Sequence, residues 1–320
     1  MRLGLLTNTK SGRNKRGFER VEAPFRDAGA ALFHFDGSVP LAELACEVRG
    51  ARIELLALNS GDGMVQGFWS ALLEAPPENW PIMALLPSGT TNMTHADLGL
   101  RDTSPKRLAQ LIALAKNDDV QSYLVERGAV RVDHLKEGPQ CGAFFGAAAI
   151  VEAIQICKER FHSHGYRGDI AHGLTVLRML YQMLRGKGRI SKMGGLPVSV
   201  GVEEQPPQDQ RVLLFIASTL ERLLFKSRPF WGVEDAPLRA SWVGYPAPHF
   251  ARLCFRLMAG GNLANLSKTA YPPPAYRSVN ARSLSLKITE SVVLDGEFYT
   301  PLPDQPLCLS TTPKARFVRL

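Results

Sequence analysis

The first 120 residues alternate short apolar runs with stretches of helical spacing, and no other feature of the sequence limits the fold as strongly. The apolar runs cover residues 3–7, 31–35, 53–58 and 82–86. Between them, apolar residues recur at helical spacing, as they do over 64–73. Buried strands that alternate with helices form a parallel sheet with helices on both faces. We therefore predict a three-layer, Rossmann-like α/β domain that binds its ligand outside the carboxyl ends of the strands.

The pattern changes after residue 120. Runs such as QSYLVERGAVRVDHL, QRVLLFIAS and ARSLSLKITESVVLDGEFY are short, several alternate with period two, and Gly, Pro and charged clusters separate them. Such spacing is typical of an antiparallel sandwich. We predict two domains, an α/β nucleotide-binding domain over 1–120 and a β-sandwich domain over 121–320. For the last roughly 15 residues, packing against the first domain is an open alternative.

Composition narrows the class of protein. A hydrophobic content of 45% and a charged content of 21% describe a folded, soluble chain. The net charge of +8 favours an anionic partner, which leaves a nucleotide, a nucleic acid or an acidic membrane surface. The five cysteines are scattered and form no CxxC pair, and the apolar stretch at the N-terminus is too short for a signal peptide. Both observations favour a cytoplasmic protein. The sequence has no helix-turn-helix, zinc-finger or RNP-like signature, so we expect no nucleic acid partner.

Three of the predicted strands are followed by polar turns that contain glycine. The first turn holds Asn8, Thr9, Lys10, Ser11 and Gly12, the second Ser60, Gly61, Asp62, Gly63 and Met64, and the third Ser88, Gly89, Thr90, Thr91 and Asn92. Glycine lets the backbone approach a ligand closely, and backbone N–H groups at such turns bind phosphate. None of the turns is a Walker A loop or a GxGxxG fingerprint. Together they predict a phosphate site at one edge of the sheet.

Asp62 lies between two glycines, and its role has two interpretations. In the functional one, the carboxylate orients Mg²⁺ through water or accepts a proton beside the phosphates. In the structural one, it only caps the helix over 64–73. The residue pattern leaves both open.

The three turns in this order resemble the catalytic domain of the diacylglycerol kinase family, which includes bacterial diacylglycerol kinases, related lipid kinases and sphingosine kinases. The motifs are NTKSG (8–12), SGDGM (60–64) and PSGTTN (87–92). The family also carries an Asp-Gly-Glu in its second domain, and this chain has Asp295, Gly296 and Glu297 in VVLDGEFY. A bare Asp-Gly-Glu is also a frequent hairpin turn. The resemblance extends over nearly the whole chain and implies the diacylglycerol kinase and NAD kinase type of fold.

The resemblance implies an ATP-dependent lipid kinase that uses Mg²⁺ and transfers the γ-phosphate to a lipid hydroxyl in the cleft between the two domains. The three turns would bind ATP, with Lys10, Arg13 or Lys15 neutralising charge. The resemblance to the bacterial enzymes implies Glu297 as the general base, with Asp295 beside it. The resemblance to the sphingosine kinases implies Asp62 instead. Asp62 is also a candidate metal ligand. An accessory metal site would involve Glu234 and Asp235, although Arg239 stands where an acid is expected.

Several alternatives remain. Met64 replaces the usual threonine and Ser60 the usual first glycine, and the segment 141–153 lacks the family's Asn and glycine turn, so a silent nucleotide-binding relative is one alternative. A kinase of a soluble substrate, like the NAD kinases, is another. The basic helical pattern over 172–184 and the aromatic and basic segment 225–232 either contact a membrane or pack against the second domain. His162 and His164 have no third ligand nearby in the sequence and are read as a surface loop. The sequence does not decide which lipid is the acceptor or whether the protein forms a homodimer.

Overall fold

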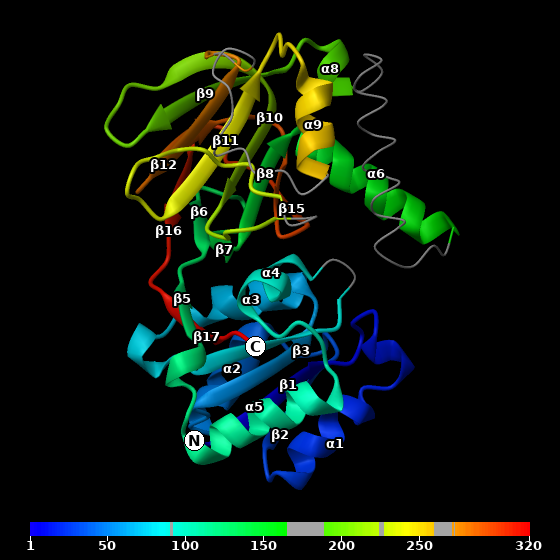
Figure 1. Ribbon diagram of the computed structural model, residues 1–320. Helices are drawn as coiled ribbons and strands as arrows, with labels where there is room; N and C mark the ends of the chain where they lie inside the picture. The colour runs from blue at the N-terminus through cyan, green and yellow to red at the C-terminus, as the bar shows by residue number, and fades with distance from the viewer. Residues whose placement is uncertain (90–91, 165–188, 224–226, 259–270, 272) are drawn as a thin grey trace. The chain divides into compact units, whose positions relative to one another are not determined.

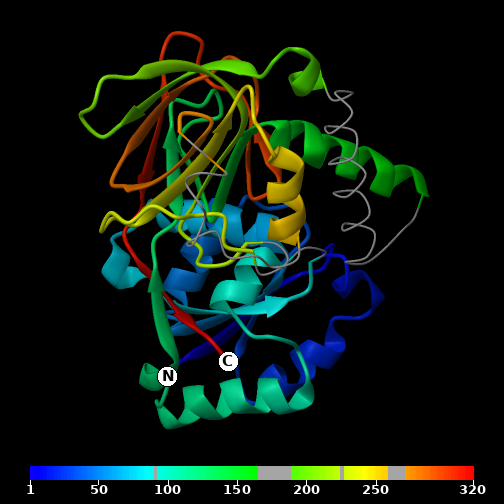
Figure 2. The same ribbon diagram turned by 45° about the horizontal axis from the view of Figure 1, so that its top comes forward.

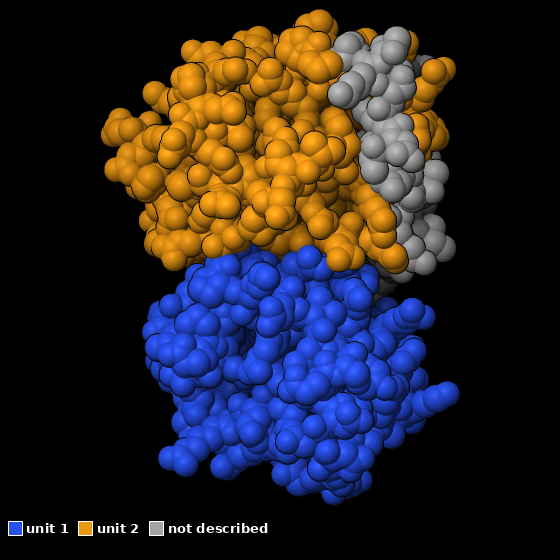
Figure 3. All heavy atoms as spheres, turned by 60° about the vertical axis from the view of Figure 1, so that its left-hand side comes forward, with its two compact units in different colours: residues 1–129, 312–320 blue, residues 130–311 orange. Residues whose placement is uncertain are grey.

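The computed structural model describes residues 1–89, 92–164, 189–223, 227–258, 271 and 273–320. The chain divides into two compact units, which Figure 3 colours separately. Unit 1 comprises residues 1–129 and 312–320, and unit 2 comprises 130–311. The boundary predicted from the sequence lies at residue 120. No helix in the described part of the chain is long and apolar enough to cross a bilayer.

The sheet of unit 1 contains the predicted strands. Its strands are β1 (Leu3–Asn8), β2 (Ala31–Phe35), β3 (Leu55–Ser60), β4 (Ile82–Pro87), β5 (Leu124–Arg127) and β17 (Ala315–Val318). They are ordered β2-β1-β3-β4-β17-β5. The first four run parallel, and every residue of β3 and β4 is buried. This is expected of strands that are covered on both faces.

Helices cover both faces of this sheet, as Figures 1 and 2 show. The helices are α1 (Glu19–Asp27), α2 (Leu41–Gly50), α3 (Asp62–Leu72), α4 (Met93–Leu98) and α5 (Pro105–Asn117), with short 3-10 turns at Asn14–Arg16, Pro77–Asn79 and Gln121–Tyr123. One face packs against α1 and α5, through Phe25 and Leu108 among others. The apolar stripe predicted for α3 is buried, including Phe68 and Trp69. The predicted three-layer α/β domain is therefore confirmed.

Strand register brings the polar turns to one edge. Thr7 on β1 pairs with Asn59 on β3, and Ser60 on β3 pairs with Pro87 on β4. Since the three strands are parallel and adjacent, all three carboxyl ends lie at the same edge of the sheet.

The C-terminal segment completes the sheet of unit 1. β17 runs parallel to β4 and antiparallel to β5. Phe317 is fully buried there, and its ring lies 5.1 Å from the ring of Trp69 on α3. The last residues therefore belong to the core of the first unit.

Unit 2 is a single antiparallel sheet. Its strands are β6 (Val130–Asp133), β7 (Gln140–Gly142), β8 (Phe144–Ala148), β9 (Leu196–Val202), β10 (Gln208–Ser218), β11 (Leu238–Gly244), β12 (Tyr276–Ala281), β13 (Leu284–Lys287), β14 (Val292–Leu294), β15 (Glu297–Tyr299) and β16 (Leu307–Thr311). The order is β15-β14-β8-β10-β9-β13-β16-β6-β7, with β11 between β10 and β12. The described helices of this unit are α6 (Ala149–His164), α8 (Arg189–Lys192) and α9 (Phe250–Met258).

The long strand β10 explains how this sheet curls. Its first half pairs with β9 and its second half with β8, and the register with β11 shifts between Val212 and Leu214. Such a bulge bends and twists a strand. Apolar side chains from strands along the whole sheet then share one core, which includes Val130, Trp242 and Leu309. The predicted antiparallel domain is confirmed, and its pairing continues through β10 as one curled sheet (Figure 1).

Two predicted features lie partly or wholly outside the described residues. The helical pattern over 172–184 falls there entirely, and so do the first residues of the segment 225–232. Their interpretation stays a prediction.

Candidate active site

The first turn folds back over the carboxyl edge of the sheet and is held by Asn14. The side chain of Asn14 is buried, and its Nδ2 donates to the carbonyl oxygens of Asn8 (2.8 Å) and Asn59 (3.0 Å). It also lies 3.2 Å from Ser88 Oγ. One amide thus connects the ends of β1, β3 and β4. Asn14 was not among the residues predicted from the sequence, because the sequence there shows only an amide within a basic loop.

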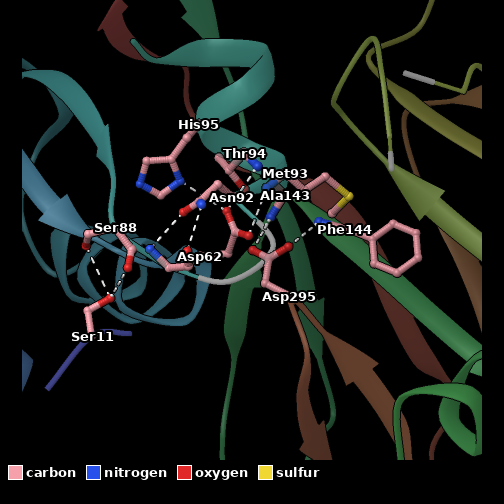
Figure 4. A network of polar contacts seen from close by, with 11 residues as sticks. Ser11, Asp62, Ser88, Asn92, Met93, Thr94, His95, Ala143, Phe144 and Asp295 are labelled. Carbon is pink, nitrogen blue, oxygen red and sulfur yellow. Dashed lines mark hydrogen bonds and ion pairs between the residues drawn. The ribbon is translucent and has the colours of Figure 1, made fainter. Parts of the chain in front are cut away.

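Ser11 connects the first turn to the third. Its hydroxyl donates to the carbonyl oxygen of Ser88 at 3.0 Å, and the two hydroxyl oxygens lie 3.2 Å apart (Figure 4). The backbone N–H of Arg13 also donates to the carbonyl oxygen of Ser88, at 3.0 Å. Both serines are buried, so the pair fixes the relative position of the two turns.

The glycines of the second and third turns contact each other. A Cβ atom added to Gly89 would lie 2.6 Å from Gly61 Cα, and one added to Gly61 would lie 3.0 Å from Gly89 Cα. Neighbouring backbone cannot move aside as a flexible side chain can. Both positions therefore require glycine because the two turns touch.

The second turn presents uncapped backbone donors at the start of α3. Gly61 is the N-cap residue and has no side chain, and no side-chain cap bond forms at this helix end within the described part of the chain. The first N–H groups of any helix have no partner within the helix, and here they belong to Asp62, Gly63 and Met64. Such a helix end attracts anions, since the donors and the helix dipole act together. The side chain of Met64 is itself buried and contributes its backbone rather than its thioether.

The carboxylate of Asp62 caps α4 instead of its own helix. Its Oδ2 accepts the N–H of Met93 at 2.9 Å, and its Oδ1 accepts the N–H of Thr94 at 3.0 Å. His95 Nδ1 lies 3.2 Å from the same Oδ1 (Figure 4). The structural interpretation, in which Asp62 caps the helix over 64–73, is therefore wrong about which helix is capped. The reason is that the side chain projects across to α4, whereas only its backbone belongs to α3.

These contacts keep Asp62 ionised. Burial by itself raises the pKa of this carboxyl, but the hydrogen bond from His95 and those from the N–H groups of Met93 and Thr94 outweigh that effect and leave the pKa below its ordinary value of 3.8. A carboxylate with a lowered pKa is a weak base. Asp62 is thus arranged as a fixed negative charge.

The third turn is closed by Asn92. Its Oδ1 accepts the N–H of Gly89 at 2.9 Å, and its Nδ2 donates to the carbonyl oxygen of Gly89 at 2.8 Å. Asn92 has a left-handed backbone with φ of 50°, which asparagine tolerates better than most residues. Its amide therefore holds the turn. Thr90, which the sequence analysis assigned to the same site, lies outside the described residues.

The remaining residues of the first turn combine anchors with exposed cations. The hydroxyl of Thr9 donates to the carbonyl oxygen of Phe35, and the N–H of Lys10 donates to Asn8 Oδ1 at 3.0 Å. The side chains of Lys10, Arg13 and Lys15 are exposed, as is Gly12. The turn thus holds its backbone rigidly and leaves positive charge accessible at the sheet edge.

Asp295 of unit 2 anchors a hairpin. Asp295 and Gly296 connect β14 to β15 with φ values of 47° and 93°, the pattern of a tight two-residue turn. The carboxylate accepts the N–H of Ala143 at 2.7 Å and that of Phe144 at 2.8 Å, and the N–H of Asp295 donates to the carbonyl oxygen of Phe144 (Figure 4). These contacts give Asp295 a structural role in unit 2.

Glu297 differs from Asp295. It is the first residue of β15, directly after the turn, and it is exposed. The hairpin that Asp295 anchors therefore carries Glu297 at a defined position on the surface of unit 2.

The candidate metal ligands Asp62, Glu234 and Asp235 belong to no cluster of metal-binding side chains among the described residues. The described residues contain no group of three or more His, Cys, Asp or Glu side chains that could hold an ion. Glu234 Oε2 accepts the N–H of Asn280 at 2.9 Å, and Arg239 donates to the carbonyl oxygen of Leu220. Asp62 already accepts three hydrogen bonds. The described residues therefore do not fit a magnesium ion held by protein groups alone.

Comparisons with known proteins agree with this geometry. The model of the diacylglycerol kinase catalytic domain matches residues 2–124, which include all three turns. Residues 2–124 are thus similar to the catalytic domain of the diacylglycerol kinases. The domain that this part of the chain matches is that of a phosphotransferase, which supports the same class of activity here. The match ends before unit 2, and a search of curated proteins gives no match.

Solved structures resemble the whole chain. A diacylglycerol kinase from Bacillus anthracis is 16% identical with a TM-score of 0.62, and covers 99% of this chain and 96% of its own. Two candidate diacylglycerol kinases from the same organism are 14% and 15% identical with TM-scores of 0.66. They cover 99% and 100% of this chain and 96% and 97% of their own. At these identities the likeness establishes the fold, which includes the curled antiparallel unit after the kinase catalytic domain.

Proposed function

We propose that this protein is an ATP-dependent lipid kinase, which transfers the γ-phosphate of ATP to a hydroxyl group of a lipid. The observation that carries the proposal is the uncapped start of α3 at the contact between Gly61 and Gly89, within a diacylglycerol kinase catalytic domain. Phosphoryl transfer depends mainly on positioning and on charge stabilisation, which a rigid set of donors supplies.

The phosphates of ATP are assigned to the edge where the three turns meet. The N–H groups of Asp62, Gly63 and Met64 supply donors at the start of α3. The exposed cations Lys10 and Arg13 supply positive charge from the first turn. The N–H groups of Met93 and Thr94 are not assigned to phosphate, because Asp62 already accepts them.

The general base in this proposal is Glu297. Its carboxylate accepts the proton of the acceptor hydroxyl, the oxygen attacks the γ-phosphorus, and the bond from that phosphorus to the β,γ-bridging oxygen breaks to release ADP. Asp62 is a poor choice for this role, since its lowered pKa makes it a weak base. Asp295 is assigned to holding the hairpin that carries Glu297.

Magnesium enters as part of the substrate, MgATP. Mg²⁺ is commonly held by substrate phosphates with one or two carboxylates rather than by a cage of protein groups. This agrees with the lack of a protein metal cluster among the described residues. The lipid is proposed to be presented at a membrane surface on the cytoplasmic side, and the charge of +8 suits an anionic one.

The acceptor class is the part of the proposal that most needs a test. Purified protein would be incubated with γ-labelled MgATP and either mixed micelles of diacylglycerol, a sphingoid base or phosphatidylglycerol, or soluble NAD. We expect label in a lipid and none in NAD. Label in NAD alone would replace the proposal by a soluble-substrate kinase. ATP binding without transfer to any acceptor would identify a catalytically silent relative.

A further inference from the structure

His95 is a buried histidine in contact with the central carboxylate of the site. It lies on α4, its side chain is 1% exposed, and its Nδ1 is 3.2 Å from Asp62 Oδ1. Its other ring nitrogen, Nε2, is buried and has no hydrogen-bond partner in the described part of the chain. A buried polar group without a hydrogen-bond partner is unfavourable, so the presence of a histidine rather than an apolar residue at this position requires an explanation.

The hydrogen-bond partners of the two ring nitrogens of His95 indicate which of them carries a proton. An ionised carboxylate only accepts hydrogen bonds, so Nδ1 carries the proton of the bond to Asp62. A second proton on Nε2 would be buried without an acceptor among the described residues, which is unfavourable. The arrangement is therefore a neutral imidazole that donates from Nδ1.

The same geometry excludes His95 as the base. A carboxylate on Nδ1 and an unpartnered Nε2 are also the parts of an Asp–His base pair. A base must reach the proton that it removes, however, either directly or through one water. With 1% of the side chain exposed, Nε2 does not meet an acceptor hydroxyl.

We propose that His95 is a positioning residue, whose bond to Oδ1 helps hold the carboxylate of Asp62 against α4 and so fixes the start of α3, where the N–H groups assigned to the phosphates of ATP lie. This inference rests on the proposed function. The three contacts to Asp62 come from adjacent residues of α4, so the carboxylate is fixed by one rigid element. Two of those donors are backbone N–H groups, which only proline would remove, whereas the His95 donor is a side chain that can be changed without altering the backbone.

The test compares His95→Leu with His95→Asn. Asparagine can place an N–H donor near the position of Nδ1, whereas leucine cannot. We expect His95→Leu to lower kcat about 10- to 100-fold, the usual effect of losing a residue that orients another group of the site. His95→Asn should recover most of that loss. Ala96→Gly is the control, since Ala96 is exposed on the same helix and glycine lowers helix stability without touching Asp62. It should lower Tm with kcat unchanged.

A double-mutant cycle decides whether His95 acts through Asp62. In an Asp62→Ala background, His95→Leu should change kcat less than about twofold, because the group that it positions is gone. An equal loss in both backgrounds, or no recovery with His95→Asn, would overturn the inference. Asp62→Asn serves as the background if the alanine variant does not fold.

The failure of the proposed function can be recognised separately. If the unmodified protein labels no lipid, the lipid kinase proposal fails, and the same cycle is measured on the Kd for ATP. A loss with His95→Leu that asparagine recovers and that vanishes without Asp62 supports the inference there also. Histidine ¹⁵N spectra of the full chain give a direct check, and a proton on Nε2 in place of Nδ1 would contradict it.

Discussion

Single residues at the carboxyl edge of the sheet each do more than the sequence indicates. Asp62 begins α3 with its backbone and caps α4 with its side chain. Gly61 and Gly89 were predicted because glycines follow strands, but the structure adds a reason, since the two residues contact each other. A contact between residues this far apart in the chain has no local signal. For the same reason the roles of Asn14 and His95 could not be predicted.

Substitution of Gly89 tests the contact between the turns. Gly89→Ala places a methyl group against the backbone of Gly61, and such overpacking costs about 1–3 kcal/mol in free energy of unfolding. ATP affinity should fall as well. Gly50→Ala is the matched control, because nothing lies within 4 Å of its added Cβ and it ends α2. Urea unfolding and calorimetric ATP titration measure both effects, and equal stability of the two variants would contradict the contact.

The lowered pKa of Asp62 predicts how stability depends on pH. A carboxyl whose folded pKa lies below its unfolded value contributes stability above the unfolded value, and that contribution is lost as pH falls through the folded pKa. Asp62→Asn should therefore lower the free energy of unfolding by about 1–3 kcal/mol at pH 7. The deficit should shrink below the ordinary pKa of 3.8. Urea unfolding at a series of pH values tests this, and a deficit that does not change with pH would mean that the charge is unimportant.

Cysteine reactivity tests burial in unit 2. Burial raises the pKa of the Cys254 thiol to about 12, so it holds almost no thiolate at neutral pH. Cys46 on α2 is exposed. Iodoacetamide treatment followed by peptide mass spectrometry should modify Cys46 well before Cys254 in the folded protein. The same rate at both sites would show that α9 does not stay packed.

At the scale of elements, the strands β1 to β4 could be predicted to within two residues at each end, since buried parallel strands are continuous apolar runs. The helix α3 was equally readable from its apolar stripe. Packing of the last residues on the first domain was one expectation, but the pairing of β17 with β4 and β5 was not readable, because it depends on segments distant in sequence. The curl of unit 2 likewise depends on the change of partner along β10, which alternation alone does not encode.

The buried ring of Phe317 makes β17 testable as a core element of unit 1. Phe317→Ala should lower the free energy of unfolding by about 3–5 kcal/mol, because it leaves a cavity beside Trp69. Val39→Ala, at a site that is 43% exposed in the same unit, should change it by less than about 0.5 kcal/mol. Chemical denaturation with Trp fluorescence measures both. A small effect of Phe317→Ala would mean that the C-terminal strand is not part of this core.

At the scale of the whole molecule, the two units carry complementary parts of the proposed chemistry. Unit 1 holds the donors and cations assigned to ATP, and unit 2 holds Glu297 on an anchored hairpin. The pairing of an α/β unit with an antiparallel unit was readable from the change of pattern after residue 120. The acceptor was not, because lipid selection depends on a surface that no short motif describes.

The most direct test of the central claim is transfer of labelled γ-phosphate from MgATP to a lipid by the full chain, run beside Glu297→Gln and Glu290→Gln. Glu290 is the control because it is a glutamate of the same unit whose contact is a surface ion pair with Arg189. We expect labelled lipid from the unmodified protein and from Glu290→Gln, and a loss of at least about 100-fold with Glu297→Gln. ADP formation without labelled lipid, or full activity of Glu297→Gln, would contradict the account.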